Sequence, residues 1–323
     1  MIGGNAGRGW RARSRRASPP SPTSQCPGRV QSWVLAVRPR TLTIAVGPVL
    51  VGTAAASADT GRFDPAIMAV ALLAAVLIQA GTNLQNDVGD FLRGADGADR
   101  IGPPRVTSLG WLSAAQVERA AALAFGLAIA LGGYLVAVGG WPVLVAGVVS
   151  IAAGIAYTRG PRPIAYTALG EFFVFVFFGL VAVGGSYYLQ AGSLAPSAIG
   201  AGAMIGLLAA AVLAVNNYRD IESDRRAGKH TLAACMGGGF ARAEYAVLLL
   251  APFAQLAALV PLADIGAAAA MPLIGLPWAA RLAWTIHRRP PGAWLNGLLA
   301  ETALLGLAFA GLLAASFGLQ RVL

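Results

Sequence analysis

The amino-acid sequence predicts an all-α protein that crosses a membrane several times. Apolar runs separated by short polar segments recur from residue 41 to residue 318, and several approach the roughly 20 residues that a membrane-spanning helix needs. Only 12% of the residues are charged, well below the roughly 25% of a soluble domain. The mean hydropathy of +0.65 agrees with this composition. These observations together predict a polytopic membrane protein of the all-α class.

Nine apolar runs define the predicted spans. They are rich in Ala and Gly, which allows neighbouring helices to pack closely. We expect tight turns at Gly139–Gly140 and at Asp264, where the boundaries between runs are shortest. The runs cover residues 41–58, 65–84, 118–138, 141–157, 169–190, 195–216, 241–262, 265–284 and 295–318.

Residues 1–31 differ from the rest of the chain in composition. Arginines stand there among Gly, Ser and Pro, with no acid and no apolar run. This predicts a disordered tail and leaves residues 32–323 as one transmembrane domain. The segment has no apolar core of a signal peptide, and Pro and Gly break it too often for the amphipathic helix of a transit peptide. An over-extended start site explains it equally well.

Several other classes of protein are excluded by the composition. Cys26 and Cys235 are too few for a disulfide framework or a zinc site, and His230 and His287 form no metal-ligand pattern. The net charge of +10 could indicate nucleic acid as a partner. The cations alternate with the apolar runs, however, and form no patch with interleaved aromatic residues. Membrane topology explains the charge better.

The basic residues predict the orientation of the chain. With the N-terminus in the cytoplasm, the tail and the even-numbered loops hold 22 of the 24 Lys and Arg residues, and only Arg62 and Arg321 lie outside. This distribution follows the positive-inside rule. We therefore expect a multi-pass protein of the cell inner (plasma) membrane whose polar loops after the second, fourth and sixth spans face the cytoplasm.

A polar stretch over residues 83–105 directly follows the second run. A carboxylate near the membrane core costs about 2.5–3.5 kcal/mol, so acids beside a membrane span indicate function. On a helix, Asp87 and Asp90 share a face with Asn83 and Asn86, because residues three or four apart are neighbours. Their oxygens therefore converge. The stretch reads NLQNDVGDFLRGADGADRIGPPR and carries Asp87, Asp90, Asp96 and Asp99.

A second polar stretch over residues 216–232 repeats this pattern after another apolar run. Asn217, Asp220 and Asp224 stand at i, i+3 and i+7, on one helical face. Clustered carboxylate and amide oxygens without His or Cys suit Mg²⁺, which usually bridges carboxylates to a substrate phosphate. The two stretches end the second and the sixth span, which suggests two four-helix repeats and one extra helix. We expect a helix break at Gly228.

These motifs resemble those of the UbiA superfamily of intramembrane prenyltransferases, from about Arg38 to the C-terminus. Within it they resemble the branch that prenylates 1,4-dihydroxy-2-naphthoate, which carries NDxxDxxxGxD followed by GPxR. The superfamily's own form, NDxxDxxxD, has a final Asp where this chain has Gly94. RPRTL at 38–42, YTRGPRP at 157–163 and GEFFVFVFFG at 170–179 also fit the branch. The matching residues are Asn86, Asp87, Asp90, Gly94, Asp96, Gly102, Pro103 and Arg105 in the first motif, and Asn216, Asn217, Arg219, Asp220, Asp224, Gly228, Lys229, Thr231 and Leu232 in the second.

The resemblance implies a fold and a reaction. The fold is nine transmembrane helices around a central cavity, with a cytoplasmic cap formed by the motif loops. The reaction is the Mg²⁺-dependent transfer of a polyprenyl group from polyprenyl diphosphate to 1,4-dihydroxy-2-naphthoate, with loss of CO₂, to give demethylmenaquinone. The expected partners are these two substrates and the lipid bilayer, with no nucleic acid.

The resemblance also implies roles for individual residues. The metal-binding and catalytic set is Asp87, Asp90, Asp220 and Asp224. Other residues are expected to bind substrate: Asn86 and Asn217 as neutral oxygen ligands or orienting groups, Arg105, Arg162, Arg219 and Lys229 at the diphosphate, and Asp96 in closing its loop.

Some readings stay open at the level of sequence. Arg105 and Lys229 also fit a role as membrane anchors, and Glu171 fits a cap, an ion pair or an acceptor site. The Phe run at 172–178 fits lipid contact or core packing as well as the lining of a cavity by Phe173, Phe175 and Phe177, with Tyr187 as a further candidate. A sister enzyme would act on 4-hydroxybenzoate, homogentisate, haem, chlorophyllide or a phosphoribosyl donor. A secondary transporter is the remote alternative, since it would need its acids near the bilayer midplane.

Overall fold

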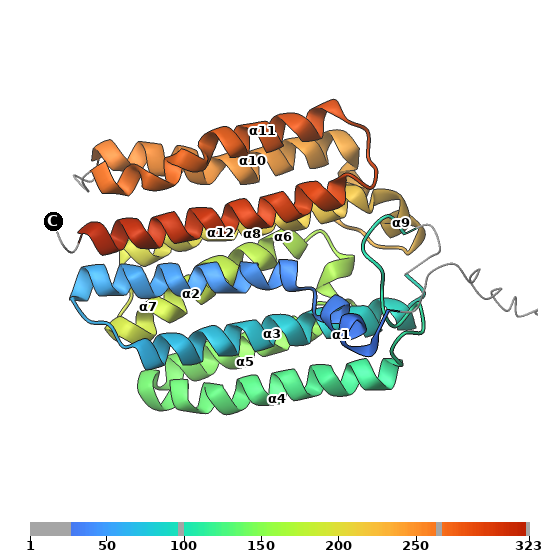
Figure 1. Ribbon diagram of the computed structural model, residues 1–323, viewed down its shortest axis with the longest axis horizontal. Helices are drawn as coiled ribbons and strands as arrows, with labels where there is room; N and C mark the ends of the chain where they lie inside the picture. Colours follow the sequence, from blue (N-terminus) through green and yellow to red (C-terminus); the bar gives the residue numbers. More distant parts are fainter. Residues whose placement is uncertain (1–26, 96–99, 263–266, 321–323) are drawn as a thin grey trace, which may run out of the picture.

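The computed structural model describes residues 27–95, 100–262 and 267–320, and in these ranges the regular structure is helical throughout. Long helices run side by side along the longest axis of the molecule (Figure 1). Asp96, Asp99 and the turn predicted at Asp264 lie outside the described residues. The long helices are α2 (Pro39–Thr60), α3 (Pro65–Leu92), α4 (Ala114–Gly139), α5 (Trp141–Ala156), α8 (Pro196–Arg219), α10 (Leu232–Leu262), α11 (Leu276–Arg288) and α12 (Leu295–Gln320).

One further long helix is built from three consecutive pieces. These are α6 (Gly170–Val174), the π-helix η2 (Phe175–Val181) and α7 (Ala182–Ala191). π-helical turns are rare in α-helices, and those that occur are frequently found at functional sites. The run predicted at 169–190 therefore contains a widened turn that periodicity did not indicate.

Among the described residues, seven helices are long and apolar enough to cross a membrane, which confirms a multi-pass membrane protein of the all-α class. All nine predicted runs fall on helices, but two of these helices miss that criterion. Helix α5 has 16 residues, and the described part of the run at 265–284 consists of the 3₁₀ helix η3 (Ala267–Gly275) followed by α11. The tight turn predicted at Gly139–Gly140 is confirmed, because Gly140 ends α4 with φ 68°.

The first described helix, α1 (Arg29–Val37), corrects the predicted end of the tail. That boundary, at residue 31, falls inside α1. Its residue Ala36 is fully buried, and Trp33, Leu35 and Val37 pack on a cluster that contains Leu84 and Val88 of α3. Apolar contacts to α3 therefore hold α1 in place, although its sequence joins an Arg-rich segment.

Close backbone contact joins the π-helix to α8 and requires glycine. A Cβ added at Gly206 would lie 2.5 Å from the carbonyl oxygen of Phe175, and one added at Gly179 would lie 2.4 Å from that of Gly202. Neither distance is sterically possible, so small residues allow the approach. Helix α8 also packs against α10 and α12 in the largest buried cluster, which includes Tyr245 and Phe309.

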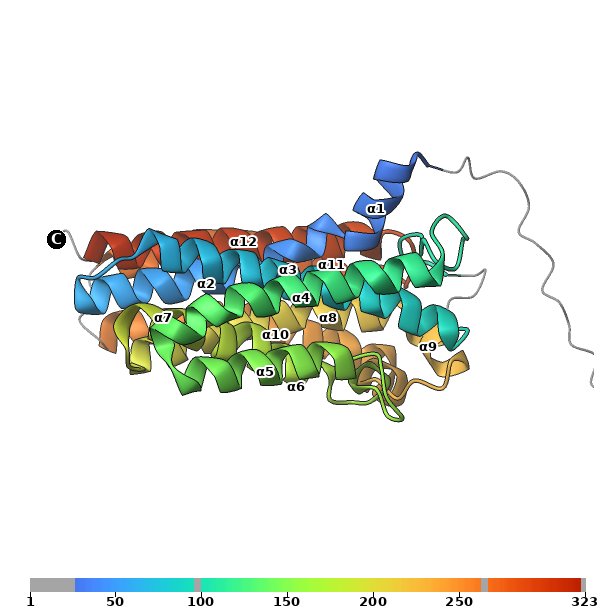
Figure 2. The same ribbon diagram turned by 90° about the horizontal axis from the view of Figure 1, so that it is seen from below.

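The segments between the helices gather their polar motifs at one end of the bundle. Helix α1, the short helix α9 (Ile221–Arg226) and the loop after α5 lie there, opposite the end where α12 stops (Figures 1 and 2). Glycines with positive φ end both motif helices: Gly94 (65°) follows α3, and Gly228 (69°) follows α9. This αL conformation is typical of a helix end and confirms the break predicted at Gly228.

Candidate functional site

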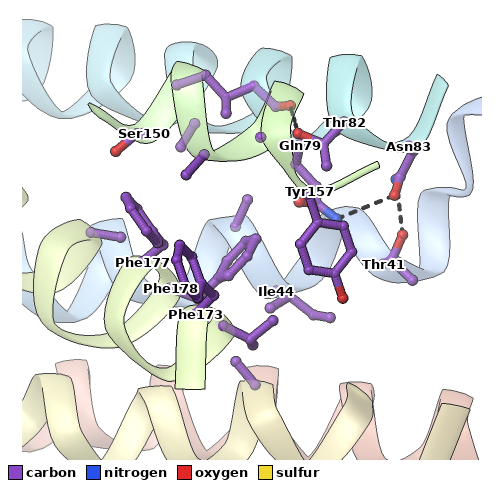
Figure 3. A pocket seen from close by; sticks show the side chains of 18 of the residues that line it. Thr41, Ile44, Gln79, Thr82, Asn83, Ser150, Tyr157, Phe173, Phe177 and Phe178 are labelled. Atoms are coloured by element: carbon purple, nitrogen blue, oxygen red, sulfur yellow. Dashed lines mark hydrogen bonds between the residues drawn. The ribbon is translucent and has the colours of Figure 1, made fainter. Parts of the chain in front are cut away.

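A cavity of about 1410 Å³ extends from the motif end into the bundle between α2, α3, α5, η2 and α8. Its deep part is apolar. Phe173, Phe177 and Phe178 lie beside Tyr157 and Ile44 in Figure 3. The rings of Phe173 and Phe177 stack with centroids 5.8 Å apart. The predicted Phe run thus lines the cavity at these positions.

Other members of the predicted aromatic set lie elsewhere. Phe172 is 61% exposed. Tyr187 is buried and donates a hydrogen bond to Asp59 Oδ2 at 2.8 Å. Phe175 does not line the cavity either, while Phe178, which was not singled out, does. The π-helical turn changes which residues share a face, so α-helical spacing alone could not select the right ones.

The first aspartate cluster lies at the buried end of α3. Arg105 Nη2 donates to Asp90 Oδ2 at 2.8 Å, and Lys229 Nζ lies 3.5 Å from Asp90 Oδ1. Asp87 is 1% exposed, and its Oδ1 accepts a hydrogen bond from the backbone N–H of Thr107 at 3.0 Å. Asp90 lines the cavity, whereas Asp87 stands behind it. Both aspartates are therefore bonded to the segment that follows α3.

The second cluster lies where α8 gives way to α9. Arg219 forms a two-pronged ion pair with Asp220: Nε donates to Oδ1 at 2.8 Å and Nη2 to Oδ2 at 2.6 Å. Asp224, one turn further on, lies 3.5 Å from Lys229 Nζ. Asp220 and Asp224 both line the cavity and are less than a tenth exposed.

Lys229 stands between the two clusters. Burial alone would lower the pKa of Lys229, but the attraction of Asp90 and Asp224 outweighs it and raises this pKa, so the ammonium group stays charged. Burial raises the pKa of Asp224 to about 6, against the opposing attraction of Lys229. Burial therefore disfavours the charged form of Asp224, and an additional cation beside it would stabilise that form.

The structure brings most predicted substrate-binding residues to this end of the cavity. Asn86, Arg105, Asn217, Arg219 and Lys229 line it. Asn86 Oδ1 is buried without a hydrogen-bond partner among the described residues. Asn217 donates to Glu171 Oε1 at 2.6 Å, which places Glu171 in an interhelical hydrogen bond.

One predicted residue is not brought to the site, and a second falls outside the part of the chain that the structure describes. Arg162 is exposed and does not line the cavity. Asp96 lies outside the described residues.

Two further residues belong to the site and were not predicted. The Tyr166 hydroxyl donates to Asp90 Oδ1 at 3.4 Å, and its ring centroid lies 4.9 Å from Lys229 Nζ. Asn296, at the start of α12, accepts a hydrogen bond from Arg219 Nη1 at 2.8 Å. Tyr166 stands three residues after the YTRGPRP stretch, and this motif could have indicated that Tyr166 lies near the site. Asn296 stands in an apolar run far from either motif, and no signal marked it.

The oxygen atoms at the site fit Mg²⁺ shared with a phosphate ligand. The described residues contain no group of three or more His, Cys, Asp or Glu side chains placed to hold a metal ion. Mg²⁺ commonly takes only one or two carboxylates and completes its shell with water and substrate phosphate. Asp90, Asp224 and the unpartnered Asn86 oxygen are hard ligands of this kind.

Fold and site together define a class of protein. It is a polytopic helical membrane protein whose apolar cavity ends in paired aspartates and fixed cations, which suits an amphiphile with a long apolar tail and a polyanionic head.

The chain belongs to the UbiA prenyltransferase family, whose signature matches residues 45–300. This confirms the resemblance seen in the motifs.

Curated relatives and solved structures agree with this assignment. The chain is 43% identical over 241 residues to "1,4-dihydroxy-2-naphthoate octaprenyltransferase" of Escherichia coli (73% of this chain, 78% of that protein). It is 37% identical over 291 residues to the protein of the same name from Mycobacterium tuberculosis (87% and 96%). A UbiA homolog from Archaeoglobus fulgidus bound to DMAPP and Mg²⁺ shares the fold, with a TM-score of 0.62, 18% identity and coverage of 89% and 99%.

Proposed function

We propose that this protein transfers a polyprenyl group from polyprenyl diphosphate to 1,4-dihydroxy-2-naphthoate with loss of CO₂, giving demethylmenaquinol, the reduced form of demethylmenaquinone. Relatives named for this acceptor are 33–43% identical to the chain. The observation that carries the proposal is the position of Lys229 between Asp90 and Asp224 at the polar end of an apolar cavity. A prenyl diphosphate has the matching polarity.

The residues at the polar end bind the diphosphate and its metal ions. We assign Asp87, Asp90, Asp220 and Asp224 to the two metal-binding clusters, with Asn86 as a neutral oxygen ligand. When bound, Mg²⁺ supplies Lewis-acid neutralisation of the leaving diphosphate. Lys229 and Arg105 both line the cavity, which supports a role for them as donors to diphosphate oxygens. Their charges favour departure of the diphosphate with the electron pair of the C–O bond.

The apolar end protects the other product of that cleavage. The allylic cation left on the prenyl chain would react with water, and the walls formed by Phe173, Phe177 and Phe178 exclude it. The electron-rich ring of the acceptor then forms the new C–C bond. The bond from the ring to its carboxylate breaks, and that electron pair restores the aromatic ring as CO₂ leaves.

We further propose that all nine predicted spans cross the membrane. Helix α5 and the η3–α11 segment would complete the seven long helices, and α1, α9 and the motif loops would form a cytoplasmic cap. The distribution of Lys and Arg supports a cytoplasmic position for this cap, with the protein in the inner (plasma) membrane of the cell.

A turnover assay tests the proposal. Purified protein in lipid is given 1,4-dihydroxy-2-naphthoate, a long polyprenyl diphosphate and Mg²⁺, and demethylmenaquinone is followed with an EDTA control. We expect metal-dependent product. Prenylation of 4-hydroxybenzoate or homogentisate instead, in competition with the naphthoate, would contradict the acceptor and move the protein to a sister branch.

A further inference from the structure

Asn296 joins the two aspartate clusters from outside either motif. It stands in the first turn of α12 and reaches the cavity. Its Oδ1 accepts a hydrogen bond from Arg219 Nη1 at 2.8 Å, and its Nδ2 donates to the carbonyl oxygen of Ile101 at 2.9 Å. An arginine can only donate and a carbonyl can only accept, so the partners fix the orientation of the amide.

Arg219 is a fixed anchor for this contact. All three of its nitrogen atoms donate within the protein, to Asp220, Asn296 and Asn216 Oδ1. Its side chain is 1% exposed. These hydrogen bonds hold the guanidinium at the second cluster, so Arg219 gives the Asn296 amide a fixed partner.

The segment Arg100–Thr107 packs directly on this anchor. A Cβ added at Gly102 would lie 2.9 Å from Arg219 Nη2. Further along, Arg105 pairs with Asp90 and the Thr107 N–H with Asp87. A contact that fixes the position of Ile101 therefore also determines how Arg105 and the Thr107 N–H approach the first cluster.

We propose that Asn296 is a positioning residue that holds the segment Arg100–Thr107 against Arg219 and thereby aligns the two clusters. The Asn296 amide does both at once, because its oxygen accepts from Arg219 while its nitrogen donates to Ile101. The kinetic consequence rests on the proposed function, whereas the structural consequence does not.

Asn296→Asp separates the two halves of the contact. An aspartate of the same size still accepts from Arg219, but it cannot donate to the Ile101 carbonyl and repels it. Amide hydrogen exchange of the segment 100–107 is measured in lipid nanodiscs, without substrate. We expect exchange two- to tenfold faster than in the wild type, the change that one lost hydrogen bond makes in a local opening equilibrium.

Thr302→Val is the matched control on the same helix. The Thr302 hydroxyl bonds to Tyr245 of α10, two turns from Asn296 and away from the motif segments. Its loss perturbs α12 without touching Ile101, so exchange of the segment 100–107 should match the wild type. Equal exchange in Asn296→Asp and wild type would overturn the proposal, as would the same acceleration in Thr302→Val.

Kinetics give the second readout. Asn296→Asp should raise the KM for polyprenyl diphosphate several-fold and leave the KM for the acceptor unchanged. Unaltered KM values together with faster exchange would show that the segment does not align the site. Should the wild type fail to turn over these substrates, the proposed function falls, while the exchange experiment still decides the role of Asn296. Asn296→Leu, which lacks both bonds, should exchange at least as fast as Asn296→Asp.

Discussion

The two aspartate clusters use the same residue types, but the protein holds them in different ways. In the first, the partners Arg105 and Thr107 come from a segment 15 or more residues along the chain. In the second, Asp220 is paired with Arg219, its immediate neighbour. The second cluster is therefore set by one helix end, whereas the first depends on how a separate segment is placed.

The two clusters also resemble each other, because within each the two carboxylates have different partners. In each, one carboxylate is bound by a donor other than Lys229, Asp87 by a backbone N–H and Asp220 by a guanidinium. The other carboxylate, Asp90 or Asp224, faces Lys229 at 3.5 Å. This comparison predicts that Asp90 and Asp224, which face Lys229, contribute more to turnover than Asp87 and Asp220.

The largest effect is expected for Asp90→Asn and Asp224→Asn. Each change removes a charge that faces the proposed diphosphate site while preserving side-chain size. We expect kcat to fall by roughly 10²–10³-fold, as for loss of a group that stabilises charge in the transition state. The measurement is steady-state turnover at saturating Mg²⁺, with thermal unfolding as a check on folding. Rates within threefold of the wild type would remove both residues from the metal-binding set.

A smaller loss is expected for Asp87→Asn and Asp220→Asn. These carboxylates are bonded within the protein and support the neighbouring carboxylates, and loss of such supporting groups typically costs about 10–100-fold. The same assay ranks the four variants. If Asp87→Asn lowered kcat as much as Asp90→Asn, the prediction that Asp90 contributes more to turnover than Asp87 would be wrong.

Lys229→Met should act mainly on binding. The methionine keeps the length and the apolar stem but removes the charge shared by the clusters. We expect the KM for polyprenyl diphosphate to rise by about tenfold, as for loss of one charged hydrogen bond, with a smaller effect on the KM for the naphthoate. Lys229→Arg should recover part of the loss. Equal increases in both KM values would contradict a contact to the diphosphate.

Arg162→Ala should have the smallest effect. Arg162 was predicted to bind the diphosphate, but it is exposed and lies outside the cavity lining. A surface substitution of this kind changes stability by about 0.5 kcal/mol or less, and we expect both KM values to stay within twofold of the wild type. A selective rise in the KM for polyprenyl diphosphate would return Arg162 to the site.

The sequence predicted those features of the fold and the site that depend on local patterns of residues. Hydropathy located the helices, and the positions of the two Asn/Asp stretches after the second and the sixth span predicted that both clusters lie at one end of the bundle. It could not predict that Asp87 turns to Thr107 while Asp90 faces the cavity, because that depends on the path of the following segment. It also missed Asn296, whose partners lie 77 and 195 positions away. Such contacts arise only when the helices pack.

The length of α3 has a consequence for how substrate reaches the enzyme. Its 28 residues span about 42 Å at a rise of 1.5 Å per residue, roughly 12 Å more than the hydrocarbon thickness of a bilayer. With the apolar start of the helix in the lipid, Asp90 lies at the level of the head groups. A prenyl diphosphate can therefore keep its head in water and its tail in lipid, as it does in the free membrane. The enzyme then meets its substrate by diffusion within the plane of the membrane. Its rate therefore depends on the mole fraction of substrate among the lipids and not on a concentration in water.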